Sequence, residues 1–155
     1  MTQPRLKVFL KDGAKLPAYA HAGDSGLDLC STVDVTLEWG RPKKVPTGVH
    51  VEIPTGYEAQ VRPRSGLSSK GVVCSFGTVD GGFTGEISAV LTLVYRPHDD
   101  GPYVPNDGKY IIKAGDRIAQ LVIAPVASVK VEQVQSLGEL SETERGERGW
   151  GSSGV

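Results

Sequence analysis

Short runs of β-branched and aromatic residues, many alternating with polar residues, follow one another along the chain and are separated by glycine, proline and aspartate. Such runs are typical of strands, because successive side chains of a strand point to opposite faces of a sheet. Only residues 65–70 have the pattern of a short helix. The sequence therefore predicts an all-β sandwich, barrel or jelly roll. The predicted strands are residues 5–10, 27–31, 34–37, 49–53, 57–63, 72–76, 86–95, 110–116, 117–126 and 129–134.

Two polar segments interrupt this pattern. Residues 96–109 are rich in proline, glycine and aspartate and lie between two strong strands, and residues 137–155 form a polar tail. The tail holds too few apolar residues to fold by itself. We therefore predict one jelly-roll domain over residues 1–136 and a flexible tail over residues 137–155. Exposed edges at VTLEWG and VKVEQV predict association with further copies of the chain.

Composition and charge narrow the range of partners. The chain has 155 residues, of which 39% are hydrophobic and 23% charged, with a net charge of −1. This composition suits one globular domain, and the charge provides no basic field for nucleic acid or a membrane surface. The sequence has no apolar run long enough to span a membrane, and we expect no secretory signal. We expect a cytoplasmic protein whose Cys30 and Cys74 are reduced and buried. The histidines lack metal-ligand spacing, which argues against zinc.

The segment AGDSGLDLCS, residues 22–31, is the first of four interior segments that combine glycine with charged or polar residues. Asp24 and Asp28 lie on either side of a bend before a strand. Carboxylates near a phosphate usually act through a hard cation such as Mg²⁺. The alternative is a turn in which the aspartates accept hydrogen bonds from the local backbone.

The second segment is RPRSGLSSKG, residues 62–71, where a strand ends and the predicted helix begins. Ser65 is placed as the N-cap, so the first N–H groups of the helix would point outward toward an anion, with Arg64 beside them. Capping alone would explain the same residues.

The third segment, GTVDGGFTGEI, covers residues 77–87. Asp-Gly-Gly between apolar runs predicts a hairpin, in which Asp80 is a turn residue and the free backbone groups are able to read the edge of a base. Phe83 would lie near the tip of this turn. An aromatic ring exposed there would be unusual unless another group covers it.

The fourth segment covers residues 113–123. Arg117 and Gln120 are polar residues in an apolar strand, and they either have structural partners or face a site.

The final residues, RGERGWGSSGV, combine phosphate-binding and stacking side chains. Arg145 and Arg148 are suited to phosphate oxygens, and Trp150 offers a flat face for a base. Gly151 and Ser152 leave backbone N–H groups free to surround an anion. A frayed polar terminus is the alternative.

In order and in sequence, AGDSGLDL, PRSGLSSKG, GTVDGGFTGEI, AGDRIAQL and RGERGWGSSG closely resemble the motifs of the trimeric dUTPase family. The resemblance runs from about Lys7 to Val155. It implies a distorted jelly roll or β-barrel with one short helix, and a homotrimer whose active sites are shared, with each tail closing over a neighbour's site. The implied reaction is Mg²⁺-assisted attack of water on the α-phosphorus of dUTP, giving dUMP and pyrophosphate. This activity limits uracil incorporation into DNA and supplies dUMP for dTTP synthesis.

The resemblance also assigns roles to individual residues. Asp80 matches the carboxylate that activates the attacking water, and Asp28 matches the aspartate that contacts Mg²⁺ through water. Base selection is assigned to the hairpin from Cys74 to Phe83. The positions that match phosphate-binding or base-binding residues are Arg64, Ser65, Gly66, Cys74, Thr78, Val79, Phe83, Gln120, Arg145, Trp150, Gly151 and Ser152, and Arg117 matches a neighbouring structural arginine.

Four positions depart from the usual family pattern. Phe83 replaces a tyrosine, Trp150 a phenylalanine, Arg148 a glycine and Cys74 an asparagine found in many bacterial members. The 96–109 loop is longer than the usual turn. Two other functions stay open at this point: a relative of dCTP deaminase, and a nucleotide-sensing regulatory trimer that binds a protein partner through the 96–109 loop.

Overall fold

Two antiparallel sheets of four strands each form the body of the protein in a computed structural model, which describes residues 3–94, 108–144 and 146–148. We call the sheet with strand order β1-β4-β8-β6 sheet A and the sheet with order β2-β10-β5-β7 sheet B; β3 and β9 form a small third sheet. The elements are β1 (Lys7–Leu10), β2 (Leu27–Cys30), β3 (Val35–Glu38), β4 (Lys43–Glu52), β5 (Tyr57–Arg62), α1 (Ser65–Ser68), β6 (Val72–Cys74), β7 (Gly77–Val79), β8 (Glu86–Leu93), β9 (Lys109–Ile112), β10 (Arg117–Pro125) and the 3-10 helix η1 (Leu137–Glu139).

The core lies between sheets A and B and follows from the alternation seen in the sequence. In β8, Ile87, Ala89 and Leu91 are buried while the residues between them are more exposed, and β5 buries Ala59 and Val61 in the same way. Burial of these aliphatic side chains supplies most of the driving force for folding, at roughly 25 cal/mol for each Å² of apolar surface. The prediction of an all-β jelly roll with one short helix is confirmed.

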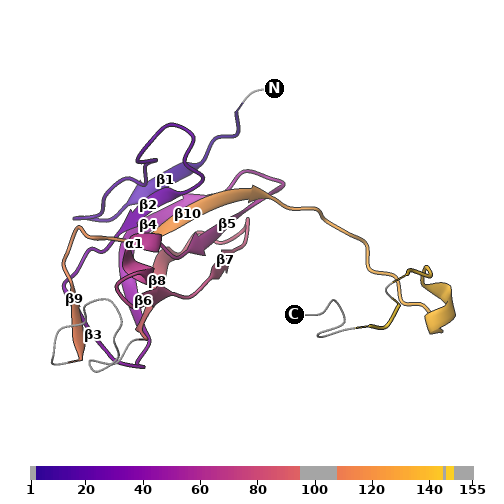
Figure 1. Ribbon diagram of the computed structural model, residues 1–155. Coiled ribbons are helices and arrows are strands. Elements are labelled where there is room, and N and C mark those ends of the chain that lie inside the picture. Colours follow the sequence, from indigo (N-terminus) through magenta and orange to yellow (C-terminus); the bar gives the residue numbers. More distant parts are fainter. Residues whose placement is uncertain (1–2, 95–107, 145, 149–155) are drawn as a thin grey trace.

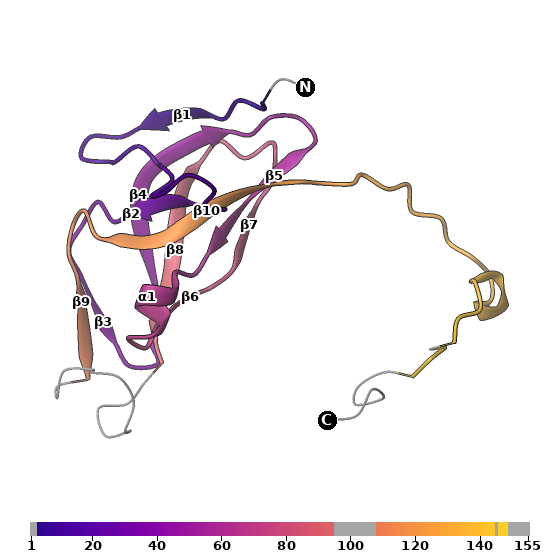
Figure 2. The same cartoon turned by 45° about the horizontal axis from the view of Figure 1, so that its top comes forward.

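The predicted strand at residues 129–134 is wrong. These residues form no strand; they lie in an extended segment that follows β10 and leaves the body of the protein before η1, as Figures 1 and 2 show. Val129 and Val131 alternate with polar residues but are exposed. A strand needs a partner edge for its backbone groups, and the chain's own sheets leave this segment unpaired in the region described. Among all residues that the structure describes, no helix has the length and apolar character that crossing a membrane requires.

The segment between β7 and β8 does not form the predicted hairpin. β7 pairs with β5 in sheet B, whereas β8 pairs with β4 and β6 in sheet A. Residues 80–85 therefore cross from one sheet to the other. A tight turn is still present at the start of this crossing, where the Phe83 N–H donates to the Asp80 carbonyl at 2.9 Å.

A bulge in β4 lies opposite the start of β8. The register shifts between Pro46 and Val49, and Gly48 takes a φ of +67°. A glycine in the left-handed region is typical of one kind of bulge, and bulges also tolerate proline inside a strand. The buried Thr47 donates its hydroxyl to the Ile87 carbonyl at 2.5 Å, so the bulge is fastened to β8.

Candidate functional site

A polar cavity of about 510 Å³ lies where β2, β10 and the start of α1 meet. Gln120 of β10 pairs directly with Asp28 of β2 and with Arg62 of β5, so the sheet register sets the positions of these residues side by side. We call this cavity the Arg64 pocket. It brings together five of the predicted site residues: Asp28, Arg64, Ser65, Gly66 and Gln120.

Asp28 links two arginines in this pocket. Its Oδ1 lies 2.9 Å from Arg64 Nε and its Oδ2 lies 3.1 Å from Arg117 Nη1, and its side chain is only 17% exposed. Arg64 Nη1 also donates to the Arg117 carbonyl at 3.1 Å. The carboxylate thus fixes the Arg64 guanidinium at the pocket wall. Arg64, Arg117 and Asp28 together carry a net positive charge, which favours an anion.

Gln120 is held in place by the chain next to Arg64. Its Nε2 donates to the Pro63 carbonyl at 2.9 Å. A Cβ on Gly26 would lie 2.4 Å from Gln120 Oε1, so only glycine allows this close approach. No local sequence signal at Gly26 predicts this contact, because the contact depends on the pairing of β2 with β10.

The N-terminus of α1 differs in one respect from the prediction. Arg64, not Ser65, is the N-cap residue, and no side chain makes a capping hydrogen bond there. Ser65 and Gly66 are the first residues of the helix and both line the Arg64 pocket. Their N–H groups lie in the first turn, where no intrahelical acceptor exists, so they remain available to a ligand.

The predicted aspartate turn at residues 22–31 is present as well. Asp24 Oδ2 accepts a hydrogen bond from the His21 N–H at 2.8 Å, and the Asp24 N–H donates to the His21 carbonyl at 3.2 Å. The two aspartates of this segment therefore differ: Asp24 supports its own turn, while Asp28 pairs with the arginines. Among the described residues, no group of three or more histidine, cysteine, aspartate or glutamate side chains is placed to hold a metal ion.

A second cavity of about 260 Å³ lies between β7 of sheet B and β8 of sheet A, and we call it the Asp80 pocket. Thr78, Val79, Asp80 and Phe83 line it, together with Glu86 at the start of β8. Phe83 is 45% exposed, and its ring folds back over Gly85.

Cys74 lines neither pocket. Its side chain belongs to the core beneath β6, and burial raises the pKa of the thiol to about 11. The thiol is therefore protonated at neutral pH and is a packing residue; a contact between the Cys74 backbone and a base stays a prediction.

The two pockets lie at different places in the chain. β7 and β2 are opposite edges of sheet B, and Val79 pairs with Ala59 whereas Gln120 pairs with Arg62. At roughly 3.3 Å per residue, Ala59 and Arg62 are about 10 Å apart along β5, and two strand spacings of about 4.8 Å each separate β7 from β10. None of the residues that the structure describes lines both pockets. The predicted site residues in the described part of the chain therefore form two groups.

The predicted tail residues Arg145, Trp150, Gly151 and Ser152 lie outside the described residues, as does nearly all of the 96–109 loop. Arg148 is described, and its guanidinium donates to the Glu144 carbonyl.

Comparisons with known proteins point to one family. The sequence pattern of the dUTPase family matches residues 12–154. A deoxyuridine 5'-triphosphate nucleotidohydrolase of Crocosphaera subtropica is 45% identical over 153 residues, which cover 96% of each chain. The chain is also similar to the solved structure of the Staphylococcus bacteriophage 80alpha dUTPase with dUPNHPP, with a TM-score of 0.86, 33% identity, and coverage of 97% of this chain and 99% of the other.

A further solved structure, a mutant dUTPase from phage phi11 of S. aureus, is described as revealing the coordination of a structural Mg(II) ion. It has a TM-score of 0.76 and 30% identity, and the match covers 86% of this chain and 98% of that one. The motif order, the jelly-roll fold, the family pattern and these relatives agree, and the chain belongs to the dUTPase family.

Proposed function

We propose that this protein hydrolyses dUTP to dUMP and pyrophosphate, with the triphosphate bound in the Arg64 pocket. The observation that carries this proposal is the Arg64 pocket itself, where Arg64, Gln120 and the first residues of α1 surround a polar cavity. Charge-assisted hydrogen bonds from a guanidinium and from backbone N–H groups are the interactions that phosphate oxygens prefer. Membership of the dUTPase family supports dUTP as the substrate.

Mg²⁺ fits this pocket only as an ion bound mainly by the substrate. Both oxygens of Asp28 are already paired with guanidinium groups, so this carboxylate offers a contact through a coordinated water and no free direct ligand. Mg²⁺ usually keeps several waters and shares its ligands with substrate phosphates. When bound, the ion would neutralise charge on the triphosphate. The role of Asp28 in this chain is then to orient Arg64 and to accept hydrogen bonds from waters of the ion.

Asp80 is the residue that we propose as the general base for water. A base must lie within about 3 Å of the atom whose proton it takes. Asp80 lines a different cavity from Arg64, so it does not meet this condition for a phosphate bound in the Arg64 pocket of its own subunit. We therefore infer that the Asp80 of one copy acts on the nucleotide held by the Arg64 pocket of another copy.

This arrangement requires an oligomer, and we propose the homotrimer of the family. The segment after β10 extends away from the body of the protein (Figures 1 and 2). We propose that the tail, residues 137–155, closes over the site of a neighbouring copy. Arg145 would then bind the terminal phosphate, Trp150 would stack on the base, and Gly151 and Ser152 would add hydrogen bonds. A tail that closes in this way also excludes water from the reacting atoms.

Base selection is proposed for the segment from Cys74 to Phe83. Thr78 and Val79 would offer backbone groups to the uracil edge, and the Phe83 ring would pack against the deoxyribose. Cytosine would present a donor where uracil presents an acceptor, and such a buried mismatch lowers turnover by about 10⁴-fold or more. The free, buried cysteines agree with a cytoplasmic setting for this chemistry.

The function is tested by analysing products from each deoxynucleoside triphosphate, with Mg²⁺ and with a chelator. We expect dUMP and pyrophosphate from dUTP and almost no product from dCTP or dTTP. Asp80→Asn is expected to lower turnover by about 10²- to 10⁴-fold while dUTP still binds, whereas Asp12→Asn, at an exposed position outside both pockets, leaves turnover unchanged. Equal turnover of all nucleotides, or ammonia release from dCTP, would show that the proposal is wrong.

A regulatory role is the second candidate. One structural relative is described as belonging to phage dUTPases that control transfer of virulence genes by a G protein-like mechanism. We propose that residues 96–109 of this chain provide the surface for a protein partner. Deleting this segment separates the two roles: unchanged dUTP turnover makes it an accessory surface, and lost turnover ties it to catalysis.

A further inference from the structure

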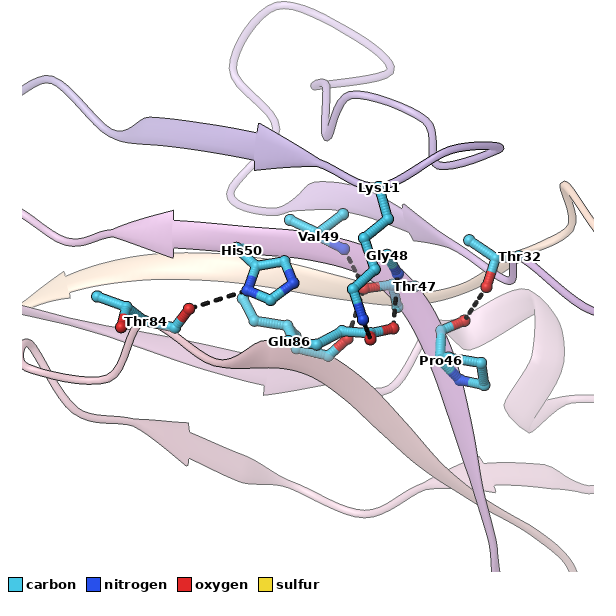
Figure 3. Close-up of polar contacts among 10 residues, drawn as sticks. Lys11, Thr32, Pro46, Thr47, Gly48, Val49, His50, Thr84 and Glu86 are labelled. Carbon is cyan, nitrogen blue, oxygen red and sulfur yellow. Dashed lines mark hydrogen bonds and ion pairs between the residues drawn. The ribbon is translucent and has the colours of Figure 1, made fainter.

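His50 makes a contact that none of the assignments above use. Its Nδ1 lies 2.9 Å from the carbonyl oxygen of Thr84, in the segment that crosses from β7 to β8 (Figure 3). This segment, residues 80–85, carries Asp80 at its start and Phe83 immediately before Thr84. In the described part of the chain, His50 is the one side chain that hydrogen-bonds to the backbone of this segment. We call residues 80–85 the catalytic crossing.

The tautomer of His50 follows from its surroundings. A carbonyl oxygen only accepts hydrogen bonds, so Nδ1 must carry the proton. His50 Nε2 is buried and has no partner among the described residues. Because only one side of the His50 ring is hydrogen-bonded, the orientation of the ring also depends on packing. Phe9 provides this packing: the two rings meet edge to face with centroids 5.6 Å apart. Phe9 lies directly opposite His50 in the pairing of β1 with β4.

The bulge of β4 holds the start of β8, directly after the catalytic crossing. Glu86, the first residue of β8, accepts a hydrogen bond from the Gly48 N–H at 3.0 Å and pairs with Lys11 Nζ at 2.7 Å (Figure 3). A Cβ on Gly48 would lie 2.7 Å from Ala14 Cβ, so the bulge is itself closely packed. Glu86 and Thr84 are thus held by neighbouring residues of β4, while residues 80–83 depend on the turn between Asp80 and Phe83.

We propose that His50 is a positioning residue for dUTP hydrolysis: by binding the Thr84 carbonyl, it sets where Asp80 and Phe83 point. The inference rests on the proposed function. His50 is not among the residues that line the Asp80 pocket, so we assign it no direct contact with the reacting atoms. Its effect is geometric, and an error of about 1 Å in the placement of a catalytic group costs up to roughly 100-fold in rate.

The test compares substitutions that keep or remove the donor at the Nδ1 position. His50→Leu removes the hydrogen bond and fills similar space, and we expect kcat to fall by about 10- to 100-fold, with a smaller change in KM. His50→Asn places an amide N–H close to the position of Nδ1 and is expected to restore most of kcat. Glu52→Gln is the matched control, since Glu52 lies two residues along β4 and makes only an exposed ion pair with Lys7. It is expected to leave kcat unchanged.

Amide hydrogen exchange provides a readout that does not depend on catalysis. Exchange of residues 80–85 should rise in His50→Leu and return toward the wild-type rate in His50→Asn, with β8 unchanged. If the wild-type protein does not hydrolyse dUTP, the proposed function fails while the exchange data still report whether His50 holds the segment. Unchanged kcat in His50→Leu, or no rescue by His50→Asn, would overturn the proposal. Should His50→Leu fail to fold, His50→Gln serves instead, because its donor lies at the Nε2 position and is expected to give no rescue.

Discussion

At the scale of single residues, the Arg64 pocket depends on one carboxylate that organises two cations. Asp28 contacts Arg64 through Nε, while Nη1 of the same guanidinium reaches the Arg117 carbonyl. Arginine makes both contacts at once because its donors lie in a fixed plane, whereas a lysine ammonium is a single point charge. The position and direction of Arg64 therefore depend on the guanidinium shape as well as on its charge.

This argument predicts that Arg64→Lys impairs the enzyme although the charge is kept. We expect kcat/KM for dUTP to fall by about 10- to 100-fold, because an ammonium cannot make both contacts and is misplaced in the pocket. Steady-state kinetics checks the effect. The control is Arg41→Lys, since the ion pair of Arg41 with Glu38 is exposed and such pairs contribute little. Equal kcat/KM in the two variants would mean that the planar arrangement of donors on the Arg64 guanidinium has no function.

Some of these residue roles were predictable and others were not. Asp28, Arg64 and Gln120 stand out in the sequence because glycine-rich breaks and isolated polar positions mark them locally. Gly26 and His50 carry no such mark: one is important because Gln120 packs on it and the other because Thr84 lies beside it. Both contacts depend on how distant strands pair, which composition does not reveal.

At the scale of elements, β4 shows where strand prediction fails. Residues 43–48, KKVPTG, contain the proline and glycine that normally end a strand, so the sequence predicted only residues 49–53. The structure continues the strand through these residues by means of the bulge. Residues 129–134 give the opposite error, because alternation shows that a segment suits a strand and does not supply the neighbouring edge.

The bulge also makes a prediction about pH. The hydrogen bond from Lys11, with a second one from the Gly48 N–H, lowers the pKa of Glu86 from its ordinary 4.5. A carboxylate with a lowered pKa stabilises the folded state above its unfolded pKa, and this stability is lost as the pH falls through the folded value. Glu86→Gln should therefore reduce the free energy of unfolding by on the order of 1 kcal/mol at pH 7, and its difference from the wild type should shrink below pH 4.5.

Urea unfolding at pH 7 and at a series of pH values below 4.5 measures this difference. Glu52→Gln is the control, because the side chains of Glu52 and Lys7 are 62% and 74% exposed while that of Glu86 is 22% exposed. An exposed pair of this kind is expected to contribute nothing measurable. A loss of stability in Glu86→Gln that stays constant down to acidic pH would contradict the charge-based explanation.

At the scale of the whole molecule, the predicted site residues in the described part of the chain form two separate groups. Of the described residues that we propose for the site, the Arg64 pocket holds the phosphate-binding ones, and the Asp80 pocket holds the proposed general base. Both groups are attached to sheet B, where strand pairing keeps them apart. The proposed closed oligomer would solve this problem, because every interface would bring the Asp80 edge of one copy against the Arg64 edge of the next.

Complementation between inactive variants tests this arrangement directly. One variant carries Asp80→Asn, and the other carries Arg64→Ala together with Gln120→Ala, so each is nearly inactive alone. If each site takes Asp80 from one subunit and the Arg64 pocket from another, random mixing in equal amounts makes about a quarter of the sites intact in a cyclic oligomer. Co-expression, purification and kinetics would then give about a quarter of the wild-type kcat per site. If both groups of residues acted within the same subunit, no mixture would contain an intact site, and the activity would remain at the level of the parent variants.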